Sequence, residues 1–74
     1  MVIPLHGLKP GEVAHIVELR SNDPARLDRL CALGLVPGSR IVLQQVAPAL
    51  VFRVGETEVS IDLAVADEIL VRTG

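Results

Sequence analysis

Aromatic side chains are almost absent from this 74-residue chain, which has Phe52 but no Trp or Tyr. A single-stranded nucleic-acid site needs several aromatic faces on which bases stack, so this sequence does not encode one. The core must be filled by Leu, Val, Ile and Ala. Cysteine is equally scarce: Cys31 is the only one, so the chain cannot form an internal disulfide, and a reducing compartment is favoured.

Basic residues are too few and too scattered to bind a phosphate backbone. Seven Lys and Arg stand against nine Asp and Glu, which gives a formal net charge of −2, and no basic cluster is longer than the pair Arg26 and Arg29. No run approaches the ~18 apolar residues of a membrane span, and the start of the chain, Met1 to His6, lacks the pattern of a signal peptide. We therefore expect a cytoplasmic protein with no nucleic-acid partner and no direct membrane insertion.

Hydrophobic residues, by contrast, make up 50% of the sequence. A chain of this length buries only about 60% of its unfolded surface, so we expect part of this apolar surplus to stay exposed. It has room for a single domain, over residues 1–74, with one small core. A deep pocket between two lobes is excluded, which argues against an enzyme.

One strand and one helix are predicted in the first half of the chain. Residues 12–19 follow a Pro-Gly turn and are rich in β-branched side chains, although their pattern leaves open which face is buried. Residues 21–24 are a helix start signal, and Gly34 suits the left-handed conformation that ends a helix. The apolar stripe of this helix, at helical spacing, comprises Leu27, Leu30 and Cys31, so Cys31 is expected to be a small buried hydrophobe.

From Ser39 onward the hydrophobic period changes to two, which is typical of strands with one buried face. Breaks at Pro48 and Gly55 divide this region into three strands. A single helical turn at 64–67 and a last strand at 68–72 follow. The pattern predicts a mainly β fold of about five strands, either a small barrel or a pair of curled sheets. One short helix after the first strand is expected to cover an open end.

Several motifs, taken together, resemble one known family. They are Leu8-Lys9-Pro10-Gly11-Glu12, Arg26-Leu27-Asp28-Arg29-Leu30 leading into Leu33-Gly34-Leu35-Val36-Pro37-Gly38, Ala47-Pro48, and Ala66-Asp67-Glu68-Ile69-Leu70-Val71. In this order they are similar to the FeoA family of ferrous iron transport accessory proteins. The resemblance implies an SH3-like β-barrel in the bacterial cytoplasm that acts with the membrane permease FeoB, whose cytoplasmic portion is a GTPase domain.

Two hypotheses of function follow from this resemblance. The first is a cytoplasmic adaptor that binds the FeoB permease, modulates Fe(II) uptake, and is recruited to the inner face of the membrane through that partner. The alternative is the C-terminal regulatory domain of a metal-dependent repressor of the diphtheria toxin repressor type, which the same SH3-like module also resembles. Weak homo-oligomerisation is compatible with either hypothesis.

Residues suited to catalysis or metal binding are sparse. No nucleophile stands beside a base and an orienting group, and no Gly-rich phosphate loop is present, so an enzyme is not expected. The weak candidates for a transition-metal site are His6, His15 and Cys31, none of which shows a ligand spacing such as His-x-x-x-His. We expect no cofactor, with a bound transition metal as the alternative.

The candidate partner surface is apolar. SH3-like barrels often bind peptides in a groove lined by loop side chains, and here the apolar surplus gathers after the helix and beyond Ala47-Pro48. A helix or strand of the partner is the expected occupant, since the aromatic lining that favours polyproline ligands is missing. The candidate contact residues are Leu33, Leu35, Val36, Pro37, Leu50 and Val51.

Overall fold

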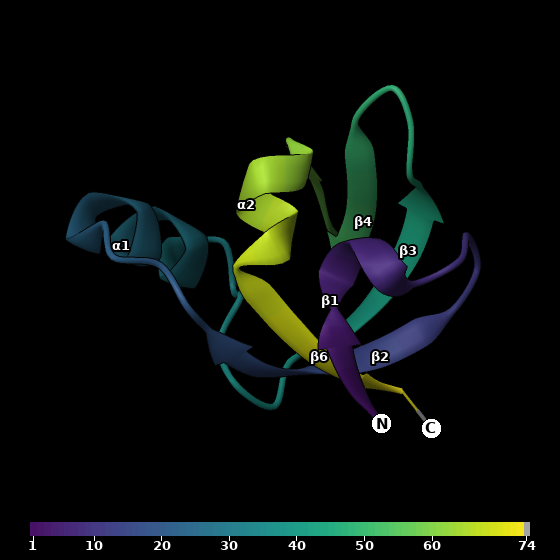
Figure 1. Ribbon diagram of the computed structural model, residues 1–74, viewed down its shortest axis with the longest axis horizontal. Helices are drawn as coiled ribbons and strands as arrows, with labels where there is room; N and C mark the ends of the chain where they lie inside the picture. Colours follow the sequence, from purple (N-terminus) through teal and green to yellow (C-terminus); the bar gives the residue numbers. More distant parts are fainter. Residues whose placement is uncertain (74) are drawn as a thin grey trace.

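Six strands form one antiparallel sheet in the computed structural model, which describes residues 1–73 (Figure 1). Their order across the sheet is β1-β6-β2-β3-β4-β5, so the first and last strands of the chain are neighbours. Over the described residues the sheet ends at β1 on one side and at β5 on the other. The strands are β1 (Val2–Pro4), β2 (Val13–Leu19), β3 (Arg40–Gln45), β4 (Leu50–Val54), β5 (Thr57–Ile61) and β6 (Ile69–Thr73).

The mainly β class is confirmed, but two details of the prediction are wrong. The prediction of about five strands missed β1, which has only three residues and ends on Pro4, too short for an alternating pattern. Proline is tolerated there because β1 is an edge strand. The helix therefore follows the second strand. The six strands form one sheet that does not close into a barrel.

Helix α1 (Pro24–Ala32) begins and ends with the signals found in the sequence. The Asp23 carboxylate accepts a hydrogen bond from the backbone N–H of Ala25 at 3.0 Å. At the other end Gly34 has φ of +94°, and the N–H groups of Gly34 and Leu35 donate to the carbonyls of Cys31 and Leu30, each at 3.0 Å. This pairing is a Schellman motif, which turns Leu35 back toward the last turn of the helix.

The second helix, α2 (Leu63–Asp67), corresponds to the single helical turn predicted at 64–67. The Asp62 carboxylate caps it by accepting from the Val65 N–H at 2.8 Å. Together with the 3-10 helix η1 (Leu5–Gly7), α2 covers the inner face of the sheet, while α1 stands at one side of the molecule (Figure 1). The cover predicted for the first helix is thus provided largely by α2 and η1.

The core lies between the inner face of the sheet and these two short helices. In β2, Ala14 and Ile16 face inward while His15 points outward, which settles the face that the sequence left open. A bulge between Ile16 and Glu18 then shifts the register of β2 against β6. The buried residues are Leu5, Leu8, Ala14, Ile16, Leu30, Leu35, Ile41, Leu43, Leu50, Phe52, Val59, Ala66, Ile69 and Val71.

Two leucines at the end of α1 provide a test of this core. Leu35 is fully buried, whereas Leu33 is 41% exposed. We expect Leu35→Ala to lower the free energy of unfolding by about 2–5 kcal/mol, because it leaves a cavity. Leu33→Ala, the matched control, should cost about 1 kcal/mol or less. Urea unfolding followed by far-UV circular dichroism measures both, and equal losses would contradict the placement of Leu35.

Candidate partner-binding groove

A groove of about 360 Å³ lies between α1, the edge strand β5 and the start of α2. It exists because β5 has no strand neighbour on its outer side within residues 1–73, and because α1 approaches the sheet without covering it. The apolar residues on its wall are Leu30 and Leu33 from α1, Val59 and Ile61 from β5, and Val65 from α2. Ile61 and Val65 also pack against the core, so these two lining side chains are held in place by the residues beneath them.

The rim of the groove is polar and contains both signs of charge. Asp23 and Asp62 cap α1 and α2, so their carboxylates already accept hydrogen bonds from backbone N–H groups. The Arg26 guanidinium donates to the Glu68 carboxylate, which ties α1 to the residue just after α2. Arg29 also lines the groove and makes no ion pair among residues 1–73. One cation is therefore free at an apolar opening.

Leu33 is the predicted contact residue that lines this groove. Leu35 and Leu50 are fully buried, so neither side chain reaches the surface, and the partner contact predicted for them stays a prediction. Leu35 is drawn into the core by the Schellman motif. Leu50 is the first residue of β4 and lies on its inner face, in register with Ile61. Both leucines fill the small core instead of adding to its surface.

The other predicted contact residues lie outside the groove. Val36 and Pro37 are exposed in the loop between α1 and β3, and neither lines the groove. Val51 alternates with the buried Leu50 and Phe52 along β4, so it points to the opposite, outer face of the sheet. The structure therefore does not bring the six predicted residues into one patch.

Sequence reasoning missed the half of the groove that β5 and α2 supply. The alternation of Val59 and Ile61 is visible in the sequence, but it is equally typical of a strand in the middle of a sheet. Only the strand order shows that β5 is an edge strand. Val65 gave no separate signal, because one apolar residue in a single helical turn indicates burial alone.

The three candidate metal ligands lie on different elements. The His6 ring is 3.0 Å from the Asp67 carboxylate, between η1 and α2. His15 lies on the outer face of the sheet, in register with Arg40 and Arg72, whose positive charges disfavour a cation there. Cys31 lies on α1. Among residues 1–73 no group of three or more His, Cys, Asp and Glu side chains is placed to hold a metal ion.

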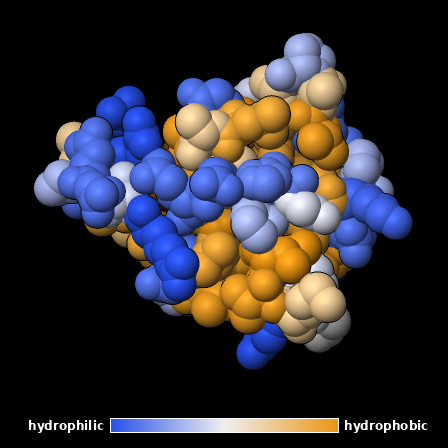
Figure 2. Space-filling model, in the orientation of Figure 1, coloured by the Kyte–Doolittle hydropathy of each residue, from blue (hydrophilic) through white to orange (hydrophobic). Residues whose placement is uncertain are grey.

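The exposure of Cys31 shows that the predicted apolar stripe of α1 is wrong at this position. It is exposed, although the spacing with Leu27 and Leu30 placed it on the buried side. Because α1 rests against the body of the protein along one narrow line, Leu30 is buried and Leu27 is half-buried, while the next position around the helix faces solvent. Figure 2 shows that the surface around α1 is mostly hydrophilic.

A family model for the FeoA domain matches residues 3–73. The chain belongs to the FeoA family. A crystal structure named as an iron uptake regulatory protein (FeoA) is similar to it with a TM-score of 0.87 and 28% identity, over 100% of this chain and 99% of that chain. The solution structure of the FeoA protein from Chlorobium tepidum gives a TM-score of 0.89 at 26% identity, over 96% of this chain and 70% of that one. The SH3-like fold implied by the resemblance is therefore confirmed.

The same fold also occurs in a longer protein. T. acidophilum IdeR is similar with a TM-score of 0.90 at 23% identity, over 99% of this chain but 34% of that chain. At 23% identity, this similarity shows a shared fold and nothing more. No curated protein sequence matches the chain. Within residues 1–73 the FeoA domain has no helix long and apolar enough to cross a membrane.

The exposed thiol of Cys31 gives a direct test of how α1 is placed. We expect a thiol reagent such as Ellman's reagent to modify Cys31 in the folded protein at about the rate seen for an accessible thiol, because the side chain lies in solvent. Cys31→Ser serves as the blank. Reaction that begins only when urea unfolds the protein would show that α1 buries this position.

Proposed function

We propose that this FeoA-family protein is an accessory protein of ferrous iron uptake that binds the cytoplasmic GTPase portion of a FeoB-type permease and modulates Fe(II) transport. Family membership supports the connection with iron uptake, and one similar structure is itself named an iron uptake regulatory protein. The groove between α1 and β5 carries the proposal. It combines an apolar lining with a rim cation, Arg29, that has no ion-pair partner among residues 1–73.

The edge strand β5 favours an extended segment of the permease as the occupant. An edge strand presents backbone N–H and C=O groups that a further strand can pair with, and its alternate side chains then enter the neighbouring pocket. Val59 and Ile61 lie on the groove side of β5, while Ser60 between them faces away from the core. A segment added to β5 would place aliphatic side chains against Leu33 and Val65, and an acidic one near Arg29.

The proposal assigns the protein to the cytoplasm, with recruitment to the inner face of the membrane through the permease. It assigns no catalysis and no cofactor to the chain itself, so any change in GTP hydrolysis or transport arises from binding. Arg26 and Glu68 have a structural part in this scheme, because their ion pair links α1 to the residue that follows α2, beside the groove.

The second hypothesis, a regulatory domain of a metal-dependent repressor, rests on fold. The likeness to T. acidophilum IdeR at 23% identity supports an SH3-like module in both proteins and no shared partner. The two hypotheses differ in the partner, a permease in the first and the rest of the repressor chain in the second. Binding to a permease fragment therefore separates them.

A matched pair of substitutions tests the groove. Leu33 and Val36 are both 41% exposed and stand three residues apart, but only Leu33 lines the groove. We expect Leu33→Asp to weaken binding to the cytoplasmic portion of a FeoB-type permease by about tenfold or more, because a carboxylate would be desolvated against aliphatic side chains. Val36→Asp should change the dissociation constant by less than about twofold. Isothermal titration calorimetry measures both constants.

Amide spectra of the free variants show whether each keeps its fold. Equal loss of affinity in both variants would assign the contact to the loop that contains Val36 and Pro37, as the sequence predicted, instead of to the groove. Absence of binding by the unsubstituted protein would overturn the adaptor function.

A further inference from the structure

The outer face of the sheet, turned away from α2 and the core, carries a cluster of cations that the groove does not use. Strand β2 runs between β6 and β3, and the register places Arg72 and Arg40 on either side of His15. On the next strand Arg53 faces outward, opposite Val42. We call this cluster the basic face: His15, Arg40, Arg53 and Arg72.

The three arginines of the basic face have no acidic partner among residues 1–73. The ion pairs of this region are His6–Asp67, Arg20–Glu18 and Arg26–Glu68, and none of them involves an arginine of the basic face. The one carboxylate in register with an arginine of this face is Glu58, opposite Arg53, and it does not form an ion pair. Arg40 and Arg72 therefore have no carboxylate in register with them, whereas Arg53 has Glu58 on the next strand.

The spacing of these arginines suits a bound anion. Arg40 and Arg72 flank one strand, so their Cα atoms lie about 10 Å apart, two strand spacings. Strand β2 separates them, so their mutual repulsion is weak and screened by salt, and a bound anion above β2 would be attracted by both. The basic face is thus complementary to negative charge, and a carboxylate placed over His15 would meet both arginines.

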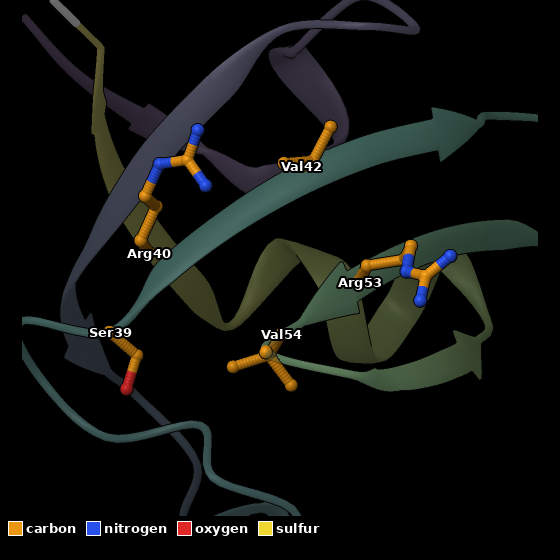
Figure 3. A pocket seen from close by; sticks show the side chains of 6 residues that line it. Ser39, Arg40, Val42, Arg53 and Val54 are labelled. Atoms are coloured by element: carbon orange, nitrogen blue, oxygen red, sulfur yellow. The ribbon is translucent and has the colours of Figure 1, made fainter.

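A shallow hollow marks where such a group fits. It has a volume of about 420 Å³ and lies at the end of the β3–β4 pair, where Arg40, Val42 and Arg53 from the outer face meet Ser39, Val54 and Gly55. Figure 3 shows Arg40 and Val42 extending from the same side of β3, whereas Ser39 and Val54 extend the opposite way. The hollow is therefore bordered by two arginines, whose guanidinium groups extend away from each other in Figure 3, and by the aliphatic side chains of Val42 and Val54.

Exposed valines surround the arginines on this face. Val2 is in register with Arg72, and Val13 with Val42; these two valines and Val17 are all more than a third exposed. Aliphatic side chains interleaved with arginines suit a protein segment that carries both acidic and aliphatic residues. They do not suit nucleic acid or an anionic membrane, because those surfaces demand a denser positive charge, which a chain of net charge −2 does not supply.

We infer that the basic face is a second docking surface, which binds an acidic segment of a partner protein whose carboxylates alternate with aliphatic residues. In an extended segment, alternate side chains lie about 7 Å apart on one side, within the reach of flexible arginine side chains across β2. This surface is on the other side of the sheet from the groove and shares no residue with it. It is therefore independent of what the groove binds.

Titration with defined probes tests this inference. The probes are a capped peptide of alternating Glu and Val, its Gln and Val analogue, a thymidine oligonucleotide, and vesicles of phosphatidylserine and phosphatidylcholine. We expect the Glu peptide to shift the amide signals of β2, β3 and β6, and its affinity to fall as salt concentration rises. The Gln analogue should not bind, and the oligonucleotide and vesicles should bind more weakly than the Glu peptide.

Matched charge reversals identify the residues. Arg40→Glu should weaken binding of the Glu peptide by about tenfold or more, whereas Lys9→Glu, the same change of charge in the turn before β2, should alter it by less than about twofold. Arg40→Gln, which removes the charge without reversing it, should give an intermediate loss. Leu33→Asp should leave peptide binding unchanged, which separates this surface from the groove.

Three results would overturn the inference. They are no binding of the Glu peptide, shifts centred on Leu33, Val59 and Val65 instead of the basic face, or tighter binding of the oligonucleotide or the vesicles. Each of these results leaves the groove and the proposed function to be judged by the permease experiment alone.

Discussion

Burial of one face of a single sheet is the constraint on which the rest of this structure depends. A chain of 74 residues cannot supply a second layer large enough to cover both faces, so the inward residues of all six strands share one core under α2 and η1. The other face stays in solvent, with valines as well as charged residues on it. The high apolar content of the sequence is thus divided between a complete core and two exposed surfaces.

The position of α1 follows from the same constraint. With the inner face already covered, α1 is held at the side by the Leu30–Leu35 end of its Schellman motif and by the ion pair of Arg26 with Glu68. The buried leucines contribute far more than the ion pair, because a partly exposed ion pair contributes about 0–1 kcal/mol. Because α1 is attached at its C-terminal end and through Arg26, space remains between α1 and β5. That space is the groove.

Local signals in the sequence predicted most of the elements, and tertiary context determined the rest. Asp23, Pro24 and Gly34 set the ends of α1 through their own backbone chemistry, so they could be recognised without knowledge of the fold. The exposure of Cys31 and the edge position of β5 could not, because both depend on which elements pack beside them. The candidate site was predicted only at Leu33, since the groove needs residues from α1, β5 and α2 together.

The two surfaces differ in the interaction that each can provide. In the groove, aliphatic side chains and an edge strand favour burial of a partner segment, which gives affinity that is insensitive to salt. On the basic face, solvent-exposed arginines favour charge attraction, which speeds encounter and weakens as salt screens it. Because they lie on different sides of the sheet, one partner with an apolar segment and an acidic segment would gain from effective concentration only if its linker passes around the edge formed by β5. Because β5 and β2 are three strand spacings apart, that linker must span at least about 14 Å.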